Sequence, residues 1–306
     1  MTDLETLHEA WEAPAAPSDR ARAEARAALL NRARPRARRR RLAVAGAVTV
    51  AVVVGLAVLD EPSGNGPKVP IASAAVLERA AAAAERRQFT PPRDDQWIYI
   101  EDRMTRSDGG APETRRLWRR ADGGGLAWRE RGRLRVETLE RVRKLPGGRA
   151  IPLVDGYKAL AALPTDPDAL LRWAYERAEH ISGAGLSEHG DVYAIFNGMV
   201  RENVLPPDLQ AAIFRALARV PGVKVETVDV SGRQALALGQ TEDWLHEELL
   251  LDPTTYEYRG ERSTIVRDAT IDPLKAGNAT GRVERGSRVI SERVATAIVG
   301  EPGELP

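Results

Sequence analysis

The pattern of hydrophobic and polar residues divides the chain into three regions. Residues 42–59 form a run of eighteen residues without a charge, composed of Val, Ala, Leu, Gly and one Thr. As an α-helix this run would be roughly 27 Å long, close to the bilayer hydrocarbon thickness of about 30 Å. The run is apolar on every face, whereas a core helix of a soluble protein is normally amphipathic. The pattern therefore predicts one transmembrane helix over residues 42–59.

The charges on either side of this run predict its orientation. Arginines are concentrated just before it, ending with Arg38, Arg39, Arg40 and Arg41, whereas acidic residues follow it directly. Short flanking segments that are rich in Arg stay on the cytoplasmic side of a membrane. We therefore expect a protein of the cell membrane with a cytoplasmic N-terminus, an extracytoplasmic C-terminal domain, and the lipid bilayer as partner of residues 42–59.

A cleaved signal peptide is the main alternative for this region. The apolar part of a signal peptide is usually about 7 to 15 residues long, with a small-residue cleavage site close behind it. Here the apolar run is longer, 41 residues precede it, and the first Ala-x-Ala pattern behind it is at residues 72–74. We therefore expect an uncleaved anchor, with a cytoplasmic tail (1–41), a transmembrane helix (42–59), a linker (60–71) and an extracytoplasmic domain (72–306).

The extracytoplasmic domain shows strand patterns, then helical patterns, then strand patterns again. Alternating strands are predicted between residues 96 and 140 and between residues 223 and 299, separated by Gly-rich and Asp-Pro turns. A helix is predicted over residues 72–88, and three more with one apolar face lie between residues 163 and 220. This order predicts an α+β fold in which about three to four helices lie against an antiparallel sheet.

Aromatic residues recur in the first group of predicted strands. Trp97, Tyr99, Trp118 and Trp128 lie on three strands separated by short turns, which indicates an antiparallel meander with one aromatic face. Such a face is either part of the core or one wall of a ligand groove, and the core is the commoner use of buried aromatic side chains.

The cytoplasmic tail begins with a short amphipathic pattern. Leu4, Leu7 and Trp11 follow at helical spacing, and Thr2 and Glu5 have the spacing of a capping box. These three apolar residues are too few for a core. They are candidates for docking to a cytoplasmic partner, and the alternative is a solvated segment that only sets the topology.

Composition excludes several kinds of site. The chain has no Cys, which removes disulfides, thiol nucleophiles and thiolate metal sites. The tail carries ten Arg against six acidic residues, whereas residues 60–306 carry 35 basic against 38 acidic residues, so we expect no direct nucleic-acid binding there. No phosphate-binding loop, nucleophile elbow or His-Glu-x-x-His spacing is present. We predict no enzyme activity, no cofactor, and no catalytic or metal-binding residues.

Three blocks of the sequence together resemble a known family. These are "LPTDPDALLRW", "RALARVPGVKV" and "EELLLDPTTYEYRGERS". As a set they resemble an uncharacterised family of single-pass membrane proteins of high-GC Gram-positive bacteria, often encoded beside extracytoplasmic-function sigma factors. The resemblance covers most of the chain and implies a membrane-bound regulator, with a sigma factor as partner of the tail. It departs from better-known anti-sigma factors, whose tails often carry a zinc site of His and Cys.

Two functional hypotheses follow from the sequence. In the first, the chain is a single-pass regulatory or sensory protein, anti-sigma-like, whose outer domain senses a signal while the tail holds a cytoplasmic factor. In the second, the chain is a tethered carrier module of the envelope, whose curved antiparallel sheet binds a lipid or a peptide. An open apolar groove beside Trp97, Trp118 and Trp128 favours the second hypothesis.

Overall fold

The computed structural model describes most of the outer domain. The described residues are 71–130, 132–139, 142–144, 150–152, 156–181, 186–271 and 281–306. The predicted tail, transmembrane helix and most of the linker lie outside them, so the docking residues of the tail and the arginine block stay predictions. Within the described ranges, no helix is both long and apolar enough to cross a membrane.

Nine strands form one antiparallel sheet. In chain order they are β1 (Trp97–Arg106), β2 (Glu113–Arg120), β3 (Gly125–Glu130), β4 (Arg133–Thr138), β7 (Lys224–Val230), β8 (Arg233–Thr241), β9 (Leu245–Leu251), β10 (Tyr258–Ile265) and β13 (Arg288–Val299). The order across the sheet is β4-β3-β2-β1-β13-β10-β9-β8-β7. The last strand, β13, therefore joins two four-stranded meanders by pairing with β1 on one side and β10 on the other.

Two further pairs of short strands lie outside this sheet. β5 (Val142–Lys144) pairs with β6 (Ala150–Pro152), and β11 (Ala269–Ile271) pairs with β12 (Gly281–Val283). Among the described residues, every helix but one comes between the two meanders in sequence. The helices are α3 (Ile71–Glu85), α4 (Tyr157–Ala161), α5 (Pro167–Ile181), α6 (Glu188–Glu202) and α7 (Pro207–Leu217). The α+β class is confirmed, and α4 adds a five-residue helix that is too short to show an apolar period.

Local chemistry fixes where these helices begin. The side chain of Asp166 accepts a hydrogen bond from the Ala169 N–H before α5, and Ser187 caps α6 in the same way. Pro207 occupies the first turn of α7, where its missing N–H costs nothing. Each cap satisfies or removes backbone donors that would otherwise lack partners.

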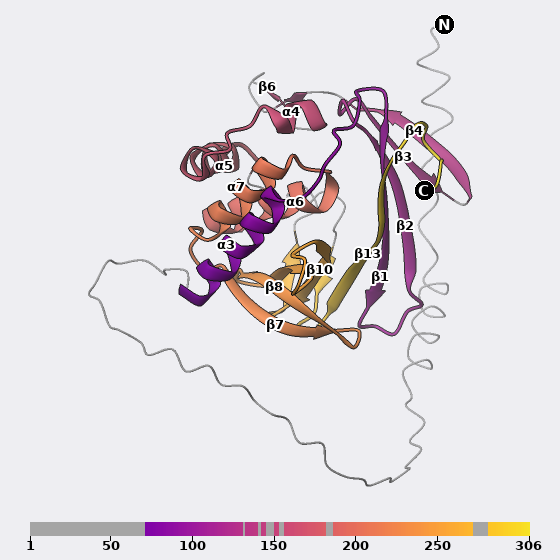
Figure 1. Ribbon diagram of the computed structural model, residues 1–306. Coiled ribbons are helices and arrows are strands. Elements are labelled where there is room, and N and C mark those ends of the chain that lie inside the picture. The colour runs from indigo at the N-terminus through magenta and orange to yellow at the C-terminus, as the bar shows by residue number, and fades with distance from the viewer. Residues whose placement is uncertain are drawn as a thin grey trace, which may run out of the picture. The chain divides into compact units, whose positions relative to one another are not determined.

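The four longer helices lie on the same side of the sheet, which curves around them (Figure 1). The apolar face predicted for each of the three helices between residues 163 and 220 is buried, since Leu170, Phe196 and Ile213 are fully buried. Tyr193 on α6 ties this core to the sheet, because its hydroxyl donates to the Leu238 carbonyl (2.6 Å) and accepts from the Leu249 N–H (3.1 Å).

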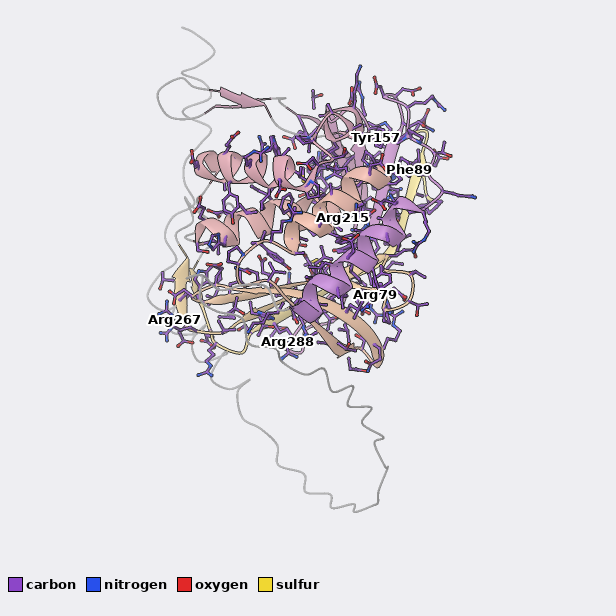
Figure 2. The ribbon with its side chains drawn as sticks, turned by 60° about the vertical axis from the view of Figure 1, so that its left-hand side comes forward. Arg79, Phe89, Tyr157, Arg215, Arg267 and Arg288 are labelled. Atoms are coloured by element: carbon purple, nitrogen blue, oxygen red, sulfur yellow. The ribbon has the colours of Figure 1, made fainter. Side chains whose placement is uncertain are left out.

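Helix α3 is held to α7 partly by charge. The guanidinium of Arg215 on α7 reaches two carboxylates of α3, Glu78 at 2.8 Å and Glu85 at 2.5 Å (Figure 2). These exposed pairs contribute little stability, and the buried face of α3, with Leu77 and Ala81, provides most of it.

The prediction of one aromatic face is wrong in its register. Tyr99 pairs directly with Trp118, so these two rings share a face, and their centroids are 5.3 Å apart. Trp128 instead pairs with Leu117, which places it on the opposite face. That opposite face is the one covered by helices, because Arg119, two residues from Leu117, pairs with Glu202 of α6.

The aromatic pair on the face away from the helices is a small core of its own. Tyr99 and Trp118 are fully buried, and Trp97 packs beside them. The C-terminal residues cover this cluster, since the Trp118 indole N–H donates to the Glu304 carbonyl (2.7 Å). Of the two uses considered for these side chains, this arrangement corresponds to the core.

Candidate functional site

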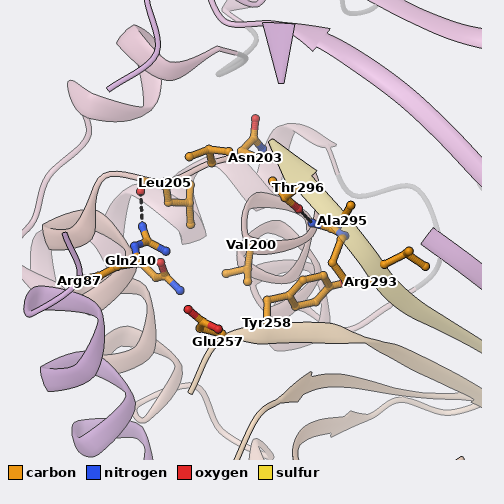
Figure 3. A pocket seen from close by; sticks show the side chains of 12 residues that line it. Arg87, Val200, Asn203, Leu205, Gln210, Glu257, Tyr258, Arg293, Ala295 and Thr296 are labelled. Atoms are coloured by element: carbon orange, nitrogen blue, oxygen red, sulfur yellow. Dashed lines mark hydrogen bonds between the residues drawn. The ribbon is translucent and has the colours of Figure 1, made fainter. Parts of the chain in front are cut away.

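A cavity of about 350 Å³ lies between the helices and the sheet, which is within the usual range for small-molecule sites. Its walls come from the segment after α3, the end of α6, the connection to α7 with the first turn of α7, the start of β10 and the middle of β13 (Figure 3). The lining residues are Arg87, Val200, Asn203, Val204, Leu205, Gln210, Glu257, Tyr258, Arg293, Val294, Ala295 and Thr296.

A second cavity of about 300 Å³ adjoins the first. The two have three lining residues in common, Arg87, Gln210 and Glu257, which therefore form the partition between them. The second cavity is otherwise bounded by α3 and by the turn before β10, and Arg79 on α3 donates to the hydroxyl of Tyr256 in that turn (3.2 Å).

The turn before β10 is fixed by a side chain that the sequence marks. One carboxylate oxygen of Asp252 accepts hydrogen bonds from the Thr254 N–H (2.8 Å) and the Thr255 N–H (2.9 Å). These bonds, the Thr255 bond foremost, lower the pKa of Asp252. The predicted Asp-Pro-Thr-Thr turn is confirmed, and it delivers Glu257 and Tyr258 to the cavity wall.

Arg87 lies at the partition with part of its guanidinium unused. One terminal nitrogen donates to the Leu205 carbonyl (2.8 Å), and the group stands 5.4 Å from the centroid of Phe89. Phe89 in turn stacks on Tyr157 at 5.6 Å (Figure 2). The Nε atom of Arg87 is buried without a hydrogen-bond partner. Burial lowers the pKa of Arg87, and the charge of Glu257 partly offsets this.

Two other polar groups of the first cavity also lack partners. Gln210 is 7% exposed, and its side-chain amide makes no hydrogen bond to any residue that the structure describes. The hydroxyl of Tyr258 is buried and unpaired, and burial raises its pKa well above the ordinary value. An unsatisfied buried polar group costs about 1 to 3 kcal/mol, so such groups next to a cavity indicate a missing partner.

The second arginine of the cavity, Arg293, has a structural role. Its Nε donates to Asp102 (2.7 Å), and its terminal nitrogens donate to Thr296 (2.8 Å) and to the Arg201 carbonyl (2.5 Å). Its guanidinium also lies over the ring of Tyr258 at 4.8 Å. Because its donors are engaged, Arg293 shapes the cavity wall and has little capacity left for a ligand.

Ion pairs continue from this wall beneath α6. Arg201 on α6 pairs with Glu261 of β10 (2.9 Å), and Glu202 pairs with Arg119 of β2 (3.0 Å). Burial opposes ionisation of Glu202, but the nearby arginines lower its pKa overall. Replacing a whole buried ion-pair network by apolar residues is often neutral or stabilising, whereas removing one partner alone is costly. Because each partner needs the other, these ion pairs fix the placement of α6 over the sheet.

Glu247 on β9 lies beside these ion pairs, but its own ionisation is unfavourable. Its side chain faces α6 next to Glu261, and burial followed by the charge of Glu261 raises its pKa. No feature of the sequence singles out Glu247, because it lies in an ordinary strand pattern.

A polar cluster on the opposite sheet face is already satisfied. His246 lies 2.8 Å from the Thr241 hydroxyl and 3.5 Å from Glu248, which Arg262 holds with both Nε and a terminal nitrogen. Burial would raise the pKa of Glu248, but the bonds from Arg262 and His246 lower it to about 2. Glu248 is thus committed to an ion pair. Among the described residues, no group of three or more His, Asp or Glu side chains is arranged to hold a metal.

Comparison with known proteins gives only distant likenesses. No family model and no curated protein matches the sequence. A DUF1329 family protein from Desulfovibrio piger is 13% identical over 76% of this chain and 93% of its own, with a TM-score of 0.22.

Two more solved structures are equally distant. A LolA superfamily protein from Nitrosomonas europaea is 11% identical over 75% of this chain and 94% of its own, with a TM-score of 0.21. A putative outer membrane lipoprotein-sorting protein domain from Vibrio parahaemolyticus is 8% identical over 74% of this chain and 91% of its own, also with a TM-score of 0.21. At such TM-scores these likenesses carry no argument about the fold or the ligand of this chain.

Proposed function

We propose that this chain is a membrane-tethered carrier or binding module of the cell envelope, whose outer domain holds an amphiphilic ligand between its helices and its sheet. The predicted helix over residues 42–59 is the tether. The observation that carries the proposal is the cavity in which Val200, Val204 and Leu205 lie beside the guanidinium of Arg87, whose buried Nε has no partner, and the amide of Gln210. Mixed walls of this kind suit a ligand with one apolar and one polar end.

The regulatory hypothesis depends on other residues. It requires Leu4, Leu7 and Trp11 to dock to a cytoplasmic sigma factor, and these lie outside the residues that the structure describes. It stays a prediction from the tail and from the family resemblance, and it is compatible with a ligand in the outer domain acting as the signal.

Binding to the cavity can be tested with the full chain in phosphatidylcholine nanodiscs. We expect saturable binding of oleate and of its neutral analogue monooleoylglycerol above the level of empty nanodiscs. Val204→Trp fills the cavity and should weaken the binding of both ligands by at least tenfold. Val136→Trp adds the same side chain at an exposed position of β4 and should leave both unchanged. Equal binding by the two variants would refute a ligand site in this cavity.

A further inference from the structure

The two arginines of the cavity differ in what they can still bind. Arg293 is engaged by Asp102, Thr296 and a backbone carbonyl. The contacts of the Arg87 guanidinium are one hydrogen bond to the Leu205 carbonyl and the ring face of Phe89. It forms no ion pair with any described carboxylate, and its Nε has no partner. A guanidinium that is half-buried without a counter-charge is costly, and the lowered pKa of Arg87 expresses that cost. Arg87 is therefore the group at which an anion would be stabilised most.

The amide of Gln210 lies next to this guanidinium. Figure 3 shows Arg87 and Gln210 side by side on one wall, with Glu257 facing them from the start of β10. An amide can donate two hydrogen bonds, and Gln210 is more than nine-tenths buried without a partner among the described residues. A guanidinium and an amide that point into one space form a donor set for a carboxylate or phosphate group.

Glu257 modulates this donor set without neutralising it. Its carboxylate acts on Arg87 electrostatically, yet the two groups form no ion pair, and Glu257 is exposed at the cavity edge. A bound anion would therefore be attracted by Arg87 and weakly repelled by Glu257. The two residues should affect the affinity for an acid in opposite directions.

We propose that the ligand is an acidic amphiphile, whose carboxylate or phosphate accepts hydrogen bonds from Arg87 and Gln210 while its aliphatic part lies over Val200, Val204 and Leu205. This inference rests on the proposed carrier function and names the chemical class of its ligand. A fatty acid and a single-chain phospholipid both present this chemistry.

The test compares oleate with monooleoylglycerol on full-chain variants in nanodiscs. Arg87→Gln should weaken oleate binding at least tenfold and change monooleoylglycerol binding less than twofold. Glu257→Gln should strengthen oleate binding severalfold. Arg172→Gln removes the same charge from an exposed position of α5, away from the cavity, and should change neither. Equal losses of oleate affinity in Arg87→Gln and Arg172→Gln, or weaker oleate binding by Glu257→Gln, would overturn the proposal.

Gln210→Leu provides a second variant in case Arg87→Gln alters the cavity itself. It removes the amide but keeps the size of the side chain, and oleate binding should fall at least threefold while monooleoylglycerol binding stays the same. Unchanged oleate binding by this variant would refute the proposed acid subsite. If both ligands bind the wild type and their affinities do not change in Arg87→Gln or Glu257→Gln, the acid subsite is wrong and the carrier function stands.

Two further probes distinguish the sources of the acid. Lysophosphatidate with the same chain identifies the phosphate form if it binds more tightly than oleate, and the carboxylate form if it binds less tightly. Inorganic phosphate alone should not displace oleate at millimolar concentrations. Displacement by inorganic phosphate would show that a free anion suffices, which would refute an amphiphilic ligand.

Discussion

The guanidinium of Arg293 lies 4.8 Å from the ring centroid of Tyr258, and the same guanidinium holds the fully buried carboxylate of Asp102. One side chain therefore joins β13, β10 and β1 at the wall of the cavity. The backbone carbonyl of Arg201 in α6 also accepts a hydrogen bond from Arg293. The position of α6 over the sheet therefore depends on Arg293.

Arg293→Met should destabilise the protein strongly. It leaves Asp102 buried with Arg115 as its remaining cation, and breaking a buried pair typically costs about 3 to 5 kcal/mol. Urea unfolding measures the change. Arg106→Met breaks the exposed pair with Glu113 and should cost less than about 1 kcal/mol. Similar losses for the two variants would show that the Arg293 network has no special structural role.

The outer domain should fold without the predicted anchor. A fragment of residues 71–306 contains every residue that the structure describes, including the main hydrophobic core from Leu77 to Leu251. We expect it to be soluble and to unfold cooperatively. Within it, Phe196→Ala should cost about 3 to 5 kcal/mol, because this fully buried ring leaves a cavity. Val294→Ala, at a 57% exposed position, serves as the near-neutral control.

Glu247→Gln should stabilise the protein at neutral pH. Folding raises the pKa of Glu247, so its favourable contribution is complete only below its unfolded pKa and is lost as the pH rises through its folded pKa. The gain from Gln should therefore be largest above the folded pKa and should shrink toward pH 4. Unfolding experiments at pH 4 and pH 7.5 measure both values. A gain that is independent of pH would contradict burial of this carboxylate beside Glu261.

The predicted topology can be tested with a reporter that is active only outside the cytoplasm. Fusion after Pro70 should give activity and fusion after Arg26 should not, because the arginines before residue 42 hold the tail inside. The reverse pattern would contradict the topology. Sequencing of the mature N-terminus separates an anchor from a cleaved signal, since cleavage would produce a chain that starts near Ala75.

The class of the fold could be predicted from local patterns, but the register of the sheet could not. Period-two alternation identified the strands, and the Asp-Pro turn at Asp252 was recognisable from its residues. Alternation does not fix how neighbouring strands align, and a shift of one residue places Trp128 on the face opposite Trp118. The two tryptophans therefore belong to different layers of the molecule.

The candidate site could not be predicted, because its residues are distant in the sequence. Arg87 follows α3, Gln210 lies in α7 and Glu257 precedes β10, and each is an ordinary residue for its local pattern. What distinguishes Arg87 and Gln210 is unused hydrogen-bonding capacity beside a cavity, and that property exists only after folding. The aromatic residues were easier to notice, yet Tyr99 and Trp118 are part of a core.

Photolabelling tests the central claim most directly. The full chain in nanodiscs is irradiated with a photoactivatable fatty acid, and the labelled peptides are identified with and without excess oleate. Labelling that oleate suppresses should fall within the segments 200–210 and 293–296, which contain most of the residues that line the cavity. Suppressible labelling confined to the opposite sheet face, around Leu134 and Val136, would contradict a ligand site between the helices and the sheet.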